Sequence, residues 1–266
     1  MPNVITLLAL CAGLTAIRLS VEGRLEWALG AIVFAAILDG IDGRVARLIK
    51  GQSRFGAELD SLADFVNFGV TPGLILYFWG LNEIGSAGWI AALVFAICAG
   101  LRLARFNVMI DDPNQPAWAG NFFTGMPAPA GAITVLLPVY ISLLGGPRLA
   151  TVTFLYTLLI AFLMVSTLPV YSGKKLGTRV PPEAVLPVFV VVVLFVALLV
   201  SYPWQVLTVG TIAYLASLPW SYMAQRRYRL AESAPQQTQP AATAAAPPVQ
   251  QPLAANDDEN RPARLN

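Results

Sequence analysis

The most informative stretch of the sequence is residues 39–64, which read DGIDGRVARLIKGQSRFGAELDSLAD. This stretch joins two apolar segments and carries four aspartates, Asp39, Asp42, Asp60 and Asp64. The first two aspartates are three residues apart and the last two are four apart, so each pair lies on one face of a helix. The turn near residues 51–53 is short enough for the two helices to pack side by side. We therefore expect the four carboxylates to converge.

The composition around this stretch is that of a membrane protein. Of the 266 residues, 56% are hydrophobic and 12% are charged, whereas soluble domains are about one quarter charged. The high hydrophobicity also excludes a disordered chain. Lys and Arg number 17 and Asp and Glu number 15, which leaves a net charge of +2. This balance argues against a nucleic acid as the partner.

Eight apolar segments approach the roughly 20 residues that a membrane-spanning helix needs. They run near 4–20, 27–48, 57–80, 87–108, 128–145, 149–170, 184–201 and 204–222. The sequence thus predicts an all-α integral membrane protein, a polytopic bundle of about eight transmembrane helices. The first segment has no preceding Lys or Arg, so we expect it to be a retained helix and not a signal peptide.

The distribution of Lys and Arg predicts the orientation of this bundle. Basic residues gather in the connections 44–55 and 171–183 and again at 226–229. By the positive-inside rule, these regions, the N-terminus and the C-terminal end lie in the cytoplasm. Residues 232–266 are rich in Pro, Ala and Gln without apolar periodicity. We expect them to form a disordered cytoplasmic tail, separate from a membrane-embedded domain of residues 1–225.

Four carboxylates at low dielectric need a compensating charge, and divalent cations are the natural source. Two ions of charge +2 would balance four charges of −1. Carboxylate oxygens suit Mg²⁺, Mn²⁺ or Ca²⁺, while the absence of histidine from the sequence argues against zinc. A two-metal carboxylate site is suited to phosphoryl chemistry.

Small residues near the aspartates fit a phosphate-bearing ligand. Gly43 and Ala46 share the face of the first aspartate pair, and Gly56 lies one turn before Asp60, so a bulky ligand can approach the backbone. Arg47 can pair with a phosphate, and Ser53 can donate a hydrogen bond. Each feature alone also fits a plain structural role, as acidic residues at helix ends reach for headgroup water and small residues let helices pack.

At these positions the chain resembles the CDP-alcohol phosphotransferase family, whose signature is D-x2-D-G-x2-A-R-x8-G-x3-D-x3-D. Every fixed position and every spacer of that signature is present. The matching residues are Asp39, Asp42, Gly43, Ala46, Arg47, Gly56, Asp60 and Asp64. The resemblance covers residues 1 to about 225.

The resemblance implies a membrane-embedded enzyme that transfers the phosphatidyl group of a CDP-linked lipid to a hydroxyl and releases CMP. It implies that the four aspartates hold two metal ions, Mg²⁺ or Mn²⁺, and that Asp64 is also the general base. The CDP-lipid would be contacted by Asn3, Thr6, Gly43, Ala46, Arg47, Ser53 and Gly56. The family fold has six core helices and a site open to the cytoplasm, so the last two segments would be additions. It further suggests a homodimer in a bacterial cytoplasmic membrane.

Three further segments resemble the phosphatidylserine-forming branch of that family. They are Arg102–Asn107, Phe123–Ala130 and Ser166–Pro169, the last followed by two lysines. On this resemblance the substrates are CDP-diacylglycerol and L-serine, in phospholipid biosynthesis. The residues expected at the serine site are Arg102, Arg105, Asn107 and Gly125.

Two other functions remain open from the sequence. A sibling enzyme of the same family would use glycerol 3-phosphate or an inositol phosphate, although an acceptor phosphate would favour a denser basic cluster. A more distant alternative is an ion-coupled transporter that uses the carboxylates as an ion path. That alternative leaves the fixed spacing of Gly43, Ala46, Arg47 and Gly56 unexplained.

Overall fold

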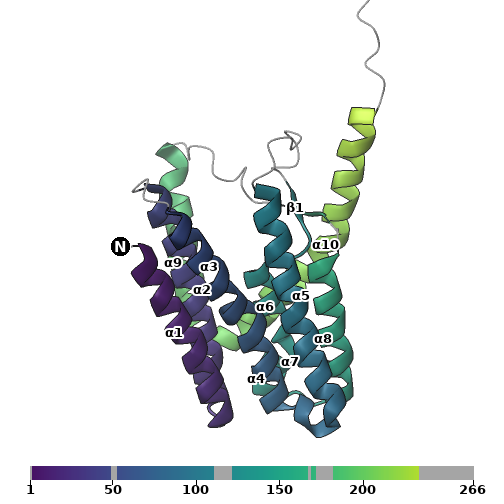
Figure 1. The fold of residues 1–266 in the computed structure, drawn as a ribbon. Helices are drawn as coiled ribbons and strands as arrows, with labels where there is room; N and C mark the ends of the chain where they lie inside the picture. The colour runs from purple at the N-terminus through teal and green to yellow at the C-terminus, as the bar shows by residue number, and fades with distance from the viewer. Residues whose placement is uncertain (1, 49–52, 111–121, 167–168, 172–181, 234–266) are drawn as a thin grey trace, which may run out of the picture.

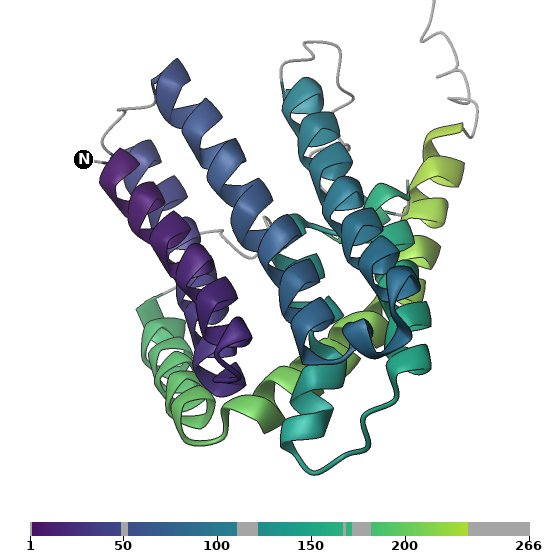
Figure 2. The same cartoon turned by 60° about the horizontal axis from the view of Figure 1, so that its bottom comes forward.

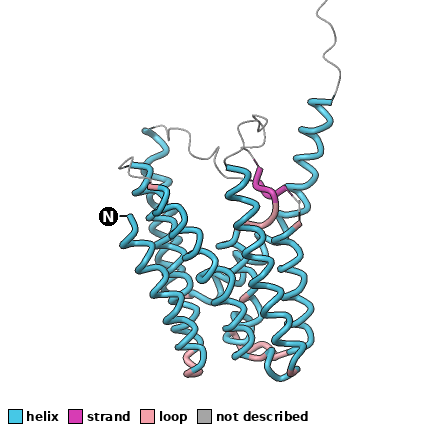
Figure 3. The backbone as a smooth tube through the Cα atoms, viewed as in Figure 1, coloured by secondary structure: helices cyan, strands magenta, loops and turns pink. Residues whose placement is uncertain are grey.

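The computed structural model describes residues 2–48, 53–110, 122–166, 169–171 and 182–233. Helices dominate the described chain (Figures 1 and 3). In order, the elements are α1 (Pro2–Val21), α2 (Leu25–Leu48), α3 (Arg54–Phe65), the π-helical η1 (Val66–Val70), α4 (Thr71–Trp79), the 3-10 turn η2 (Leu81–Ile84), α5 (Ser86–Ile110), β1 (Phe122–Thr124), α6 (Ala128–Val135), α7 (Leu137–Leu143), α8 (Ala150–Val165), β2 (Pro169–Tyr171), α9 (Pro182–Ser201) and α10 (Pro203–Ser233).

The first two helices form a closely packed antiparallel pair. Gly23 adopts a φ of 76° in the turn between them, a left-handed conformation that glycine adopts at little cost. α1 also contacts α3 and α4, and α5 packs against α8. α10 leaves α9 and crosses the base of the bundle to its far side (Figure 2), where it contacts α7, α6 and β2.

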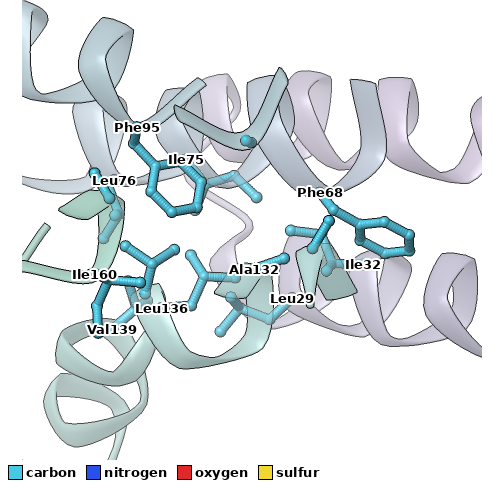
Figure 4. Packing of buried hydrophobic residues seen from close by; sticks show 14 of the residues in the cluster. Leu29, Ile32, Phe68, Ile75, Leu76, Phe95, Ala132, Leu136, Val139 and Ile160 are labelled. Carbon is cyan, nitrogen blue, oxygen red and sulfur yellow. The ribbon is translucent and has the colours of Figure 1, made fainter. Parts of the chain in front are cut away.

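The core lies where α2, η1, α4, α5, α6, α7 and α8 meet (Figure 4). Its fully buried side chains include Leu29, Ile32, Phe68, Ile75, Phe95, Leu136 and Ile160. Fully buried alanines, among them Ala16, Ala28, Ala91 and Ala99, let neighbouring helix backbones approach closely. Small residues at helix contacts are typical of membrane bundles, where packing drives association.

Within the described residues, three helices are long and apolar enough to cross a membrane, namely Asn3–Val21, Arg54–Trp79 and Ser86–Met109. The α9–α10 pair, bent by 118°, is either a fourth, broken span or a re-entrant loop. The membrane helical class is thus supported, but eight crossings are not confirmed. α2 is not among these helices, and its apolar stretch holds the acidic residues Glu26, Asp39 and Asp42. The helices Ala128–Leu143 and Ala150–Val165 are apolar but shorter.

The structure refines the predicted segments at three places. The segment expected at 57–80 contains the π-helical turn η1, and the segment expected at 128–145 is broken into α6 and α7, with Pro138 in the first turn of α7. α10 continues eleven residues past its predicted end at 222, to Ser233. The strands β1 and β2 form an antiparallel pair that the sequence did not predict. The rest of the predicted tail, residues 234–266, lies outside the described residues.

Candidate functional site

Three of the four predicted carboxylates come together between α2 and α3. One oxygen from each of Asp39, Asp60 and Asp64 lies within 4.8 Å of the other two. All three side chains are partly buried. The convergence expected from the helical spacing of these three residues is therefore present.

Ser53 sets the register of α3 and so the position of its aspartates. Its Oγ accepts a hydrogen bond of 3.0 Å from the backbone N–H of Gly56, which makes Ser53 the N-cap. An N-cap side chain satisfies one of the free N–H groups at a helix start. Ser53 was predicted to contact the nucleotide, and its hydroxyl proton stays available to a ligand because the cap uses the oxygen as acceptor.

Asp42 is not one of the three clustered carboxylates, although its charge acts on Asp39 and Asp60. It is 4% exposed, and its Oδ2 accepts a hydrogen bond from the hydroxyl of Thr6 on α1. Its Oδ1 is buried and has no hydrogen-bond partner among the residues that the structure describes. A buried carboxylate oxygen without a partner is costly. The structure thus gives Thr6 a direct role in orienting Asp42.

The cluster fits a divalent cation on the chemistry of its donors. Asp39 and Asp64 share a side-chain hydrogen bond, which requires a proton between two carboxyl groups. Asp60 adds a third carboxylate beside them. A divalent cation would replace that proton, balance the charges and satisfy the free oxygen of Asp42, and hard carboxylate oxygens are the ligands that Mg²⁺ and Mn²⁺ prefer.

The residues predicted to contact the CDP-lipid surround the start of α3 and the end of α2. A Cβ added at Gly56 would lie 3.0 Å from Oδ1 of Asn3 and 3.1 Å from Oγ of Ser53, so the missing side chain lets the start of α1 approach α3. A Cβ added at Gly43 would meet nothing within 4 Å, which leaves space beside the carboxylates. Ala46 and Arg47 belong to the last turn of α2, and their side chains lie outside what the structure describes.

Arg102 on α5 is a buried cation near the carboxylates. It is 8% exposed, its Cζ lies 5.0 Å from the ring centroid of Phe106, and its charge acts on Asp64 and on Tyr214. In the described part of the chain, the Arg102 Nε and the Tyr214 hydroxyl are both buried without a hydrogen-bond partner. Sequence reasoning missed Tyr214, because a single tyrosine in an apolar segment carries no spacing signal.

The other residues expected at the serine site have partners within the protein. Arg105 donates from Nη1 to the backbone carbonyl of Val165 at 2.7 Å. Asn107 donates from Nδ2 to Oγ of Ser61 at 2.9 Å, next to Asp60 in the chain. These contacts join α5 to the end of α8 and to α3, so they support the framework of the site.

Gly125 joins two of the segments that resemble the phosphatidylserine-forming branch. Its φ is +78°, and an added Cβ would lie 2.6 Å from the carbonyl oxygen of Met164 and 2.8 Å from that of Ser166. Only glycine permits this backbone approach. Just before it, Thr124 pairs with Pro169 in the β1–β2 ladder. With the bond from Arg105 to Val165, the three segments meet at one place.

The π-helical turn η1 follows Asp64 directly and presents Asn67 toward α1. Asn67 is 1% exposed, and its Oδ1 has no hydrogen-bond partner within the residues described. A Cβ at Gly13 on α1 would collide with this side chain. No pattern in the sequence predicts this turn, although such turns are frequent at functional sites.

Comparison with known proteins places these features in a family. The sequence model of the family described as CDP-alcohol phosphatidyltransferase matches residues 1–168, and that of CDP-alcohol phosphatidyltransferase 2 matches residues 183–219, within α9 and α10. A Mycobacterium tuberculosis protein named CDP-diacylglycerol–serine O-phosphatidyltransferase is 42% identical over 229 residues, 85% of this chain and 79% of the relative. A Helicobacter pylori protein of the same name is 34% identical over 219 residues, 80% of this chain and 87% of the relative. A third, from Bacillus subtilis, is 37% identical over 137 residues, 51% of this chain and 73% of the relative.

Proposed function

The chain belongs to the CDP-alcohol phosphatidyltransferase family, and we propose that it transfers the phosphatidyl group of CDP-diacylglycerol to the hydroxyl of L-serine. The products are phosphatidylserine and CMP. The observation that carries this function is the group of three carboxylates, which lies on the complete family signature in a chain 42% identical to a protein of that name. The enzyme is a transferase of phospholipid biosynthesis.

The proposed reaction forms one bond and breaks one. The serine hydroxyl oxygen attacks the phosphorus that carries the diacylglycerol, and the bond from that phosphorus to CMP breaks. Asp64 takes the proton of the serine hydroxyl as general base. Asp39, Asp42, Asp60 and Asp64 would hold two divalent ions, Mg²⁺ or Mn²⁺, which when bound supply positive charge to the diphosphate.

The nucleotide and diphosphate are proposed to lie over the start of α1 and the hairpin of α2 and α3. Asn3, Gly56 and Ser53 gather at one point there, and the open space beside Gly43 leaves room for the ligand. Thr6 acts through Asp42, whose carboxylate it holds. Ala46 and Arg47 follow Gly43 on the same helix and complete the proposed CDP-lipid site.

The serine carboxylate is proposed to bind between Arg102 and Tyr214. Both present buried polar atoms that lack a partner in the described chain, and a carboxylate accepts hydrogen bonds from a guanidinium and a hydroxyl. Arg102 also acts on Asp64, so this position would bring the serine hydroxyl close to the proposed base. Arg105, Asn107 and Gly125, which have contacts within the protein, would shape the acceptor site.

Tyr214→Phe is expected to raise the KM for serine while leaving the KM for CDP-diacylglycerol unchanged. The loss of one hydrogen bond to a charged group should raise the serine KM by about tenfold. The measurement is CMP release over a serine titration. Tyr202→Phe is the matched control, because Tyr202 lies in the same hairpin with its side chain exposed. Equal serine KM values for Tyr214→Phe and the wild type would show that Tyr214 does not bind the serine carboxylate.

We also propose the membrane arrangement that the family resemblance and the charge pattern suggest. Residues 1–225 would form the membrane domain, with six core helices and the two C-terminal helices as additions. The site would face the cytoplasm of a bacterial cytoplasmic membrane, since Arg44 and Arg47 flank it and positive residues favour that side. The homodimer through membrane helices rests on the resemblance alone, and residues 232–266 would form the tail.

The test of the proposed function is CMP release by the purified full chain with CDP-diacylglycerol and a divalent metal. Four parallel reactions contain L-serine, glycerol 3-phosphate, inositol phosphate or no acceptor. We expect release that depends on serine. Release with a phosphate-bearing acceptor instead would keep the reaction class and replace the acceptor. If no CMP is released in any of the four reactions, the result would argue for the transporter.

A further inference from the structure

An apolar cavity of about 280 Å³ lies between α2, α6, α9 and α10. Its walls include Val33 and Ala36 from α2, Ile133 from α6 and Phe195 from α9. α10 contributes Val206, Leu207, Gly210 and Thr211 to the lining, and the cavity is partly open. Two of these four helices, α9 and α10, belong to the C-terminal part that the second family model matches. The cavity therefore depends on the helices proposed as additions to the core.

The lining of the cavity suits a hydrocarbon chain. Its side chains are apolar except for Thr211, and apolar cavities of roughly 150 Å³ already take up a hydrocarbon such as benzene. α9 exposes apolar side chains along nearly its whole length, so this part of the structure faces a hydrocarbon environment. Lipid chains are thus available where the cavity lies.

One polar group in the cavity requires a partner. Thr211 is 3% exposed, and its Oγ1 has no hydrogen-bond partner within the part of the chain that the structure describes. A hydroxyl can donate to a carbonyl. Each acyl chain of a diacylglycerol begins with an ester carbonyl, so a lipid chain with its ester group would satisfy both the apolar walls and this hydroxyl.

The position of the cavity connects it with the carboxylates. Ala36 precedes Asp39 by three residues on the same face of α2, about 4.5 Å along the helix axis. Val33 lies about 9 Å from Asp39 along that axis. The cavity is therefore beside the helix that carries the proposed diphosphate site, on the side away from its charged C-terminal end.

We propose that this cavity seats one acyl chain of CDP-diacylglycerol, with Thr211 donating to its ester carbonyl, and that the α9–α10 hairpin thereby sets the acyl-chain preference. The proposal rests on the proposed function, because it takes the lipid substrate from it. An acyl chain of an ordinary membrane phospholipid, which lacks CDP, has the same chemistry. The experiment below distinguishes the CDP-lipid from such a phospholipid as the source of the bound acyl chain.

Gly210 offers a way to fill the cavity without disturbing the packing. It lines the cavity, and a Cβ added there would meet nothing within 4 Å. Gly210→Leu should lower kcat/KM for dipalmitoyl CDP-diacylglycerol by about tenfold, which is the loss expected when about two methylene groups of the lipid are no longer buried. The value for the dihexanoyl lipid should not change. The assay is CMP release in mixed micelles, with the lipid given as a mole fraction.

Gly30→Leu is the matched control, since Gly30 lies on α2 with open space around it but does not line the cavity. It should leave the ratio of the two lipids unchanged. Thr211→Val keeps the shape of the side chain and should raise the KM for the dipalmitoyl lipid roughly fivefold by removing one hydrogen bond. Equal losses for both lipids in Gly210→Leu, or the same change in Gly30→Leu, would overturn the proposal.

A binding measurement separates this proposal from the proposed function. The thermal midpoint of the full chain is measured without serine, with either CDP-lipid or with a phospholipid of the same chains that lacks the nucleotide. We expect the dipalmitoyl CDP-lipid to raise the midpoint most, and Gly210→Leu to remove its advantage over the dihexanoyl form. If these shifts in the midpoint are seen but no CMP is released, the acyl-chain site is supported and the proposed transferase function is contradicted. If both phospholipid and CDP-lipid act alike, the cavity holds bulk lipid and the proposal is wrong.

Discussion

Replacing Asp64 by asparagine is expected to lower CMP release about a thousandfold, in the range that general base catalysis contributes. Asparagine keeps the size of the side chain but cannot take the proton of the serine hydroxyl. It also weakens the group of three carboxylates, since Asp64 supplies one of the oxygens that lie within 4.8 Å of one another. The measurement is serine-dependent CMP release at saturating lipid and metal.

The fold should survive this change. Without metal, the carboxyl group of Asp64 shares a hydrogen bond with Asp39, and the amide of asparagine can donate a hydrogen bond to Asp39 in the same place. Asparagine also places no negative charge beside Asp39 and Asp60. The thermal midpoint of Asp64→Asn in chelator should therefore equal or exceed that of the wild type. Glu58→Gln on the exposed face of the same helix is the control and should keep full turnover. Near-normal turnover of Asp64→Asn would show that another group is the base.

Removal of divalent metal is expected to reduce CMP release to background, with recovery on addition of Mg²⁺ or Mn²⁺. The donor set explains this expectation, because three carboxyl groups otherwise crowd together without a balancing charge and, among the described residues, Asp42 Oδ1 is buried without a partner. The same ions should raise the thermal midpoint, since a ligand about a hundredfold above its Kd adds about 2.7 kcal/mol to stability. The two measurements are CMP release and thermal unfolding across a metal titration.

The binding effect should depend on the proposed ligands. Asp60→Asn removes one of the three clustered carboxylates and should abolish most of the metal-dependent rise in the midpoint. Glu58→Gln, two residues earlier on the exposed side of α3, should keep it. Full activity in chelator, or an equal metal response in the Asp60→Asn variant, would contradict a metal site at these aspartates.

Much of the site could be predicted from the sequence because its signals are local. Helical spacing alone predicts that Asp60 and Asp64 share a face, and the short turn between the helices predicts that Asp39 comes near them. The structure has these three together. Asp42 is outside this group of three and is held by Thr6 of α1, because a contact with another helix decides which way a buried carboxylate turns.

Features that depend on distant segments had no such signal. The π-helical turn at Val66–Val70 and the pairing of β1 with β2 arise from packing between segments that no periodicity connects. The approach of Tyr214 to Arg102 joins α10 to α5 across more than a hundred residues. The predicted number of membrane crossings is not confirmed, since three helices among the described residues are long and apolar enough to span and α9 and α10 bend by 118° at their junction.

The sequence by itself determined the chemistry of this protein, namely the carboxylates, their helical spacing, the missing histidine and the apolar segments that carry them. These properties need only the identity of the side chains and the geometry of one or two helices. The tertiary structure alone decided which buried polar atoms lack partners among the described residues, where the three segments that resemble the phosphatidylserine-forming branch meet, and that α9 and α10 line a cavity beside α2. The physical reason is that burial and close contact are set by how helices pack, and packing depends on all the side chains at once.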